Sequence, residues 1–135
     1  LPEAGPHAMG FYFGPASAPT MALATPLSPD PLAETHADRS DAWRHLDVAI
    51  VQHLLVERIC EPTFTPGGHV NWSFPHTLDE LAALTDASND RLGVVCQATP
   101  LDAVRQVSDA GELMPPKSTF FYPKLATGMV LNPLE

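Results

Sequence analysis

The segment SDAWRHLDVAIVQHLLVERICEP, residues 40–62, carries the strongest structural signal in the chain. Its apolar residues recur at intervals of three and four, which is typical of a helix with one broad buried face. Ser40 or Asp41 can cap its start, and Pro62 is expected to end it. We therefore predict a central core helix whose buried face consists of Leu46, Ile50, Val51, Leu54, Leu55 and Ile59.

Upstream of this helix the chain is rich in proline and predicts only short strands. Two apolar stretches, residues 9–13 and 20–25, are separated by the turn-forming pair Gly14-Pro15, which indicates a loose hairpin. A polar connection, residues 27–39, leads from the hairpin to the helix.

The beginning of the chain suggests a fragment. It starts Leu-Pro-Glu rather than with Met, and it shows neither a basic region nor an apolar signal segment. We expect residues 1–39 to be the remnant of an upstream part and residues 40–135 to form a C-terminal domain.

Downstream of the central helix, further strands and helices are expected to alternate. The predicted strands are residues 69–74, 92–98 and 128–131; the second is a continuous apolar run typical of a buried strand. A capping-box spacing predicts a helix over 77–84, and an initial proline with a closing glycine predicts another over 99–111. The order β-β-α-β-α-β-α-β favours an α/β fold, a mixed sheet covered by about three helices, with an α+β arrangement as the alternative.

Composition and charge exclude several classes of protein. Sixteen acidic against seven basic residues give a net charge of −9. Binding to nucleic acid is not expected, because phosphate contacts need a broad basic surface. No apolar run approaches the roughly 18 residues of a membrane-spanning helix. Cys60 and Cys96 are too few for a disulfide framework, and buried free thiols suit a reducing cytoplasm.

Residues 113–128, LMPPKSTFFYPKLATG, are the best candidate for chemistry. They contain both lysines of the chain, and residues 113–134 contain no acid. Ammonium and hydroxyl groups bind phosphates and carboxylates, and the prolines stiffen the loop. The alternative is that the loop only packs over a sheet edge. We predict an anion-binding loop formed by Lys117, Ser118, Thr119 and Lys124, with Asp47 and Tyr122 as supporting candidates.

The stretch MPPKSTFFYPKL, from Met114 to Leu125, resembles the C-terminal signature of the bacterial "domain of unknown function 1015" family. Leu46-Asp47-Val48, Thr99-Pro100 and Asp109-Ala-Gly-Glu112 resemble the same proteins in the same order. The resemblance covers about residues 40–134. Because members of that family are longer, the chain resembles only their C-terminal part.

The resemblance implies a phosphate-handling role. The family has no settled activity, but its members are described as ParB-like and are similar to free-serine kinases. This implies ATP and Mg²⁺ as cofactors of the full-length protein, none within this stretch, and catalytic groups that lie partly upstream. The implied partners are a small anionic molecule or a nucleotide, and a second copy in a homodimer. The alternative function is a non-catalytic structural or dimerisation domain.

Other candidate residues favour structural roles. Asp47 can face the positive end of the central helix, pair with Arg44, or act as a catalytic base, and ion pairing is the favoured role. The six histidines lack the spacing of a metal site, so we predict no metal and expect solvated or capping histidines. Trp43 and Trp72 are expected to anchor the core or an interface.

Overall fold

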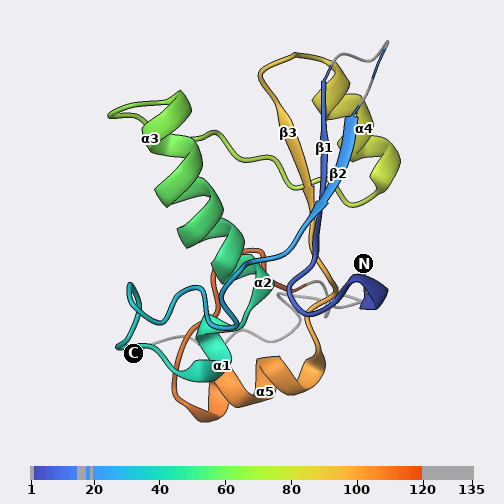
Figure 1. Ribbon diagram of the computed structural model, residues 1–135. Coiled ribbons are helices and arrows are strands. Elements are labelled where there is room, and N and C mark those ends of the chain that lie inside the picture. The colour runs from blue at the N-terminus through green and yellow to red at the C-terminus, as the bar shows by residue number, and fades with distance from the viewer. Residues whose placement is uncertain (1, 15–17, 19, 120–135) are drawn as a thin grey trace, which may run out of the picture.

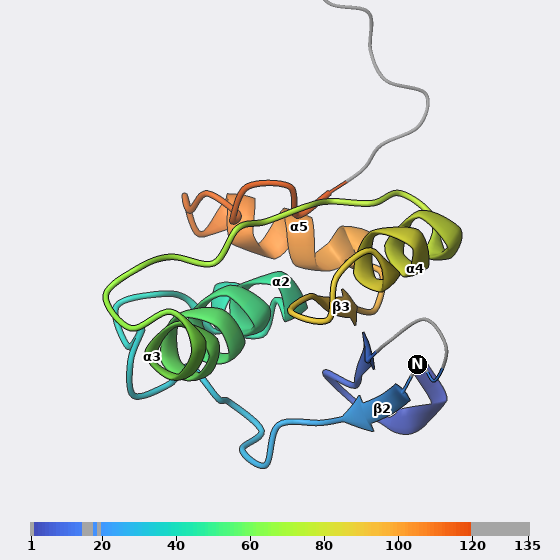
Figure 2. The same cartoon turned by 90° about the horizontal axis from the view of Figure 1, so that it is seen from above.

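The computed structural model describes residues 2–14, 18 and 20–119. Its three strands form one antiparallel sheet in the order β2-β1-β3, with helices beside it (Figure 1). The strands are β1 (Met9–Phe13), β2 (Thr20–Ala24) and β3 (Leu92–Val95). Seen from above, β3 lies between α5 and β2 (Figure 2). The structure is thus a mixed α/β arrangement, and the predicted hairpin of β1 and β2 is confirmed.

The central helical segment starts where the sequence places it. Ser40 caps α1 (Asp41–Arg44), because its Oγ accepts a hydrogen bond from the Trp43 amide at 3.2 Å. The helix then ends at His45. Leu46 is extended, with φ −74° and ψ 124°. The single predicted helix is therefore broken after its first turn.

The helix restarts and continues in three parts: α2 (Asp47–Ala49), η2 (Ile50–Cys60) and α3 (Glu61–Phe64). The turns of η2 are wide, with amides bonded to carbonyls five residues back, as from Glu61 to Val56. Pro62 does not end the helix as predicted. It lies in the first turn of α3, a position in which proline is tolerated.

The wide turns change which residues are buried. Residues five apart share a face, so Val56 follows Val51 into the core. Leu54 and Leu55 are only partly buried. Ile59 is 49 % exposed, so its predicted burial is wrong. Residues 57–59 are all exposed, so the core ends near Val56.

Residues 69–74 do not form the predicted strand. The backbone amide of Val70 is satisfied by Glu61 Oε1 at 3.2 Å, and the Trp72 ring stacks on Phe74 at 5.9 Å. The segment therefore finds its partners outside the sheet. The last predicted strand, residues 128–131, lies outside the described residues.

The two shorter helices are confirmed, with changes in detail. Thr77 caps α4 (Leu78–Asp86), and α5 (Leu101–Asp109) follows β3. The helix α4 packs against Gly93 of β3, where a Cβ atom would lie 2.6 Å from Leu81 Cδ2. Leu78, the first residue of α4, is exposed.

The core gathers residues from both sides of the predicted domain boundary at residue 39. Met9 from β1 and Leu32 from the connection pack with α1, the long helix and α5. Trp43 is 4 % exposed, which confirms it as a core residue, whereas Trp72 is 45 % exposed. The buried cluster comprises Met9, Leu32, Trp43, Leu46, Ala49, Ile50, Val51, Val56 and Val107.

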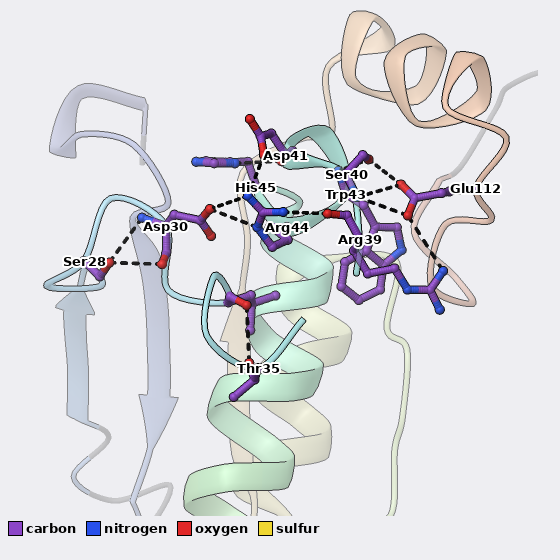
Figure 3. Close-up of polar contacts among 11 residues, drawn as sticks. Ser28, Asp30, Thr35, Arg39, Ser40, Asp41, Trp43, Arg44, His45 and Glu112 are labelled. Carbon is purple, nitrogen blue, oxygen red and sulfur yellow. Dashed lines mark hydrogen bonds and ion pairs between the residues drawn. The ribbon is translucent and has the colours of Figure 1, made fainter. Parts of the chain in front are cut away.

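A polar network fastens the connection to α1 (Figure 3). Arg44 Nε donates to Asp30 Oδ2 at 2.9 Å, and the same guanidinium also bonds to Asp41. On the other side of α1, the Glu112 carboxylate accepts from the Ser40 amide at 3.1 and 3.2 Å. These contacts join three segments that are distant in the sequence.

Acid should weaken this network. The hydrogen bond from Arg44 lowers the pKa of Asp30 below its usual value of 3.8, although burial opposes the shift. A carboxylate with a lowered folded-state pKa adds stability above its unfolded pKa, and this stability is lost as the pH falls through the folded pKa. Urea denaturation of Asp30→Asn should therefore show a flatter pH dependence than the parent below about pH 4. The control Asp109→Asn removes an exposed carboxylate and should follow the parent; parallel curves for Asp30→Asn would contradict the prediction.

Candidate functional site

One edge of the sheet brings distant segments together. Because β1 and β3 are antiparallel, with Gly10 opposite Val95, the residues before β1 lie beside those after β3. Gln97 Nε2 donates to the Gly5 carbonyl oxygen at 2.9 Å and joins the two segments. The start of α2 reaches the same edge through Asp47.

Asp47 is the central residue of this edge. Its Oδ1 lies 2.7 Å from His7 Nδ1, and its Oδ2 accepts a hydrogen bond from the backbone amide of Gln97 at 3.3 Å. The side chains of His7 and Asp47 are 15 % and 13 % exposed. Both carboxylate oxygens therefore have partners from other segments.

The predicted pair of Asp47 and Arg44 is wrong. Arg44 pairs with Asp30 and Asp41 instead. The extended Leu46 separates α1 from α2, so the two residues do not have the neighbouring positions of a continuous helix. Asp47 does lie at the start of a helix, α2, as predicted, but its partner is a histidine 40 residues away.

His7 is a residue that sequence reasoning missed. Its backbone has a φ of 57°, a region that few residues other than glycine adopt, although histidine is enriched there. Its ring centroid lies 5.6 Å from that of His45. No spacing rule connects His7 with Asp47, and only the positive φ, visible in the structure, distinguishes it from the other histidines described.

Cys96 lies beside this pair but is not a reactive thiol. Burial and then the charge of Asp47 raise its pKa to about 11. Burial also raises the pKa of Cys60. Because the thiolate is the nucleophilic form, both cysteines stay protonated and unreactive near neutral pH. This agrees with the expectation of ordinary thiols.

The predicted anion loop is attached to the same edge. Thr99 Oγ1 donates to the Ser118 carbonyl oxygen at 3.2 Å, and the Ser118 hydroxyl donates to the Pro115 carbonyl. The Ser118 hydroxyl is therefore used within the loop. Lys117 and Thr119 are exposed. Lys124 and Tyr122 lie outside the described residues.

The loop lies next to the start of α5. Pro100 is the N-cap of this helix, not its first helical residue as predicted, and it provides no side-chain cap. Amides in the first turn of a helix have no partner inside the helix, and the helix dipole makes this end positive. The first turn also carries the exposed acid Asp102.

Neither a metal-binding cluster nor a membrane-spanning helix is found in the part of the chain that the structure describes. No group of three or more His, Cys, Asp or Glu side chains there has an arrangement that could hold a metal ion. None of the helices in that part combines the length and the apolar character needed to cross a bilayer.

Comparison with known proteins does not add a family. The chain matches no protein-family model, no curated protein and no solved structure. The resemblance carried by residues 114–125 therefore stays a prediction, and functional conclusions depend on the site itself.

Proposed function

We propose that the chain binds the anionic group of a small molecule, a phosphate or a carboxylate, on the loop of residues 115–119, and that it serves a longer small-molecule kinase. The observation that carries the proposal is the position of Lys117. Lys117 is exposed on a turn, and the carbonyl of the next residue, Ser118, accepts a hydrogen bond from Thr99. Thr99 lies two residues before the start of α5. An ammonium group beside an uncapped helix start suits an anion.

The charge distribution supports this choice. The whole chain carries 16 acids, and none lies between residues 113 and 134. An anion approaching the molecule is therefore repelled over most of its surface and attracted locally at the loop. This contrast favours a small anion over an extended polyanion such as duplex DNA.

The backbone at Lys117 supports a functional role as well. Its φ of 63° is a conformation that glycine adopts at no steric cost and that lysine adopts with strain. Residues held in sparsely populated backbone conformations cluster at active sites and ligand clamps, where the strain is part of the mechanism.

The variant Lys117→Gly tests the proposal without disturbing the turn. Isothermal titration with inorganic pyrophosphate should show affinity reduced about ten- to a hundredfold, since a hydrogen bond to a charged group contributes about 1.5–3 kcal/mol. Thermal stability should stay equal or rise slightly, because glycine relieves the strain. The control Arg105→Ala removes an exposed cation from α5 and should bind as the parent does. A titration that Lys117→Gly leaves unchanged would rule out the anion site.

The second candidate function is a dimerisation domain. Every residue of β2 is exposed, and its outer edge has no strand partner among the described residues. Unpaired edge strands can pair with a second copy. This candidate predicts a concentration-dependent dimer in sedimentation experiments and no effect of Lys117→Gly on pyrophosphate binding.

A further inference from the structure

The His7–Asp47 pair is held from three directions. One carboxylate oxygen of Asp47 lies 2.7 Å from His7 Nδ1, and the other accepts a hydrogen bond from the backbone amide of Gln97 at 3.3 Å. The Gln97 side chain in turn holds the Gly5 carbonyl, two residues before His7. The imidazole is therefore positioned by contacts from α2, from the end of β3 and from its own loop.

This arrangement defines the tautomer of His7. A carboxylate oxygen only accepts, so Nδ1 carries the proton and Nε2 of the neutral ring carries a lone pair. The same logic applies to carboxylate–histidine pairs that act as proton acceptors. The titratable groups around His7 are Asp47, the ring of His45 and the thiol of Cys96.

One segment of the chain contacts both the pair and the proposed anion loop. Gln97 contacts Asp47, and Thr99, two residues later, contacts Ser118. Two residues of extended chain span at most about 7 Å. The segment 97–99 thus attaches both the His7–Asp47 pair and the loop to the same end of the sheet.

We propose that His7, positioned by Asp47, is a general base that accepts the proton of a hydroxyl group on the small anionic molecule bound at loop 115–119. This inference rests on the proposed function for the identity of the ligand. The O–H bond breaks, the proton forms a bond to Nε2, and the electron pair stays on oxygen, which becomes a nucleophile. Asp47 is a positioning residue in this step.

The variant His7→Asn removes the base and keeps the fold. Asparagine tolerates a positive φ, and its amide nitrogen can replace Nδ1 as the donor to Asp47. The probe is hydrolysis of p-nitrophenyl acetate, in which the base takes a proton from water, the water oxygen attacks the ester carbonyl, and p-nitrophenolate leaves. The rate should fall about tenfold or more in His7→Asn. The control His69→Asn removes an exposed histidine that also pairs with a carboxylate, and should leave the rate unchanged.

The variant Asp47→Asn tests the positioning role. The Gln97 amide needs an acceptor, so the new amide oxygen should face Gln97 and its NH₂ group should face His7. His7 Nδ1 then becomes the acceptor, and the proton moves to Nε2. Long-range ¹H–¹⁵N NMR of histidine-labelled protein should show the Nδ1–H tautomer in the parent and the Nε2–H tautomer in this variant. Ester hydrolysis should fall together with this change.

The outcomes separate this inference from the proposed function. Arg105→Ala, which lies outside the loop, should leave hydrolysis of the neutral ester unchanged, whereas pyrophosphate should inhibit hydrolysis in the parent and not in Lys117→Gly. Hydrolysis that depends on His7 but is insensitive to pyrophosphate would support the base and overturn its link to the anion loop. Equal rates in the parent and His7→Asn, or the same tautomer in the parent and Asp47→Asn, would overturn the base itself.

Discussion

Replacing Trp43 by alanine is expected to destabilise the fold by about 3–5 kcal/mol, the range for a buried tryptophan. The indole is 4 % exposed and lies among the rings of His36 and His53, at centroid distances of 5.4 and 5.3 Å. Its Nε1 also donates to the Leu113 carbonyl oxygen at 3.1 Å, which ties α1 to the segment after α5. The substitution removes a large apolar volume and leaves this carbonyl without its donor.

Urea denaturation followed by circular dichroism measures this loss. Trp43→Phe should cost less than Trp43→Ala, because it keeps most of the apolar volume but loses the hydrogen bond, which contributes about 1 kcal/mol. The matched control is Trp72→Ala, since that ring is 45 % exposed and contacts Phe74 alone among the aromatic rings described. A loss below about 1 kcal/mol for Trp43→Ala would mean that the core is not centred on α1.

Replacing Ile50 by alanine is expected to cost about 2–5 kcal/mol, whereas Ile59→Ala should stay within about 0.5 kcal/mol. The repeating pattern of the sequence treats the two isoleucines alike. In the structure Ile50 is 2 % exposed and Ile59 is 49 % exposed, because the core covers the first part of η2 and leaves residues 57–59 exposed. Leu54→Ala should lie between them, since Leu54 is partly buried.

The comparison of these variants shows how far along η2 the core extends. Chemical denaturation of Ile50→Ala, Leu54→Ala and Ile59→Ala under one set of conditions gives three differences in unfolding free energy. Equal losses for the two isoleucine variants would contradict the exposure of Ile59 and would extend the core to the end of η2. The unequal result would explain why a regular apolar pattern overestimates the buried face here.

Local signals in the sequence determined the elements that depend on few neighbouring residues. The caps Ser40 and Thr77 need only the amides of the following turn, and both were predictable. Only six residues separate β1 and β2 in the sequence, so their pairing is also local. The burial of Trp43 follows from its position at the start of an apolar helix.

The long-range contacts were decided by the tertiary structure alone. His7 and Asp47 are 40 residues apart, and they meet only because β1 and β3 pair in one register and α2 starts at the same edge. The break at Leu46 likewise separates Asp47 from Arg44, which their spacing suggested as partners. The physical reason is that caps and turns are satisfied within a few residues, whereas the partner of a side chain depends on how whole elements pack. The lysine loop could therefore be proposed from composition, but the pairing of His7 with Asp47 could be found only in the fold.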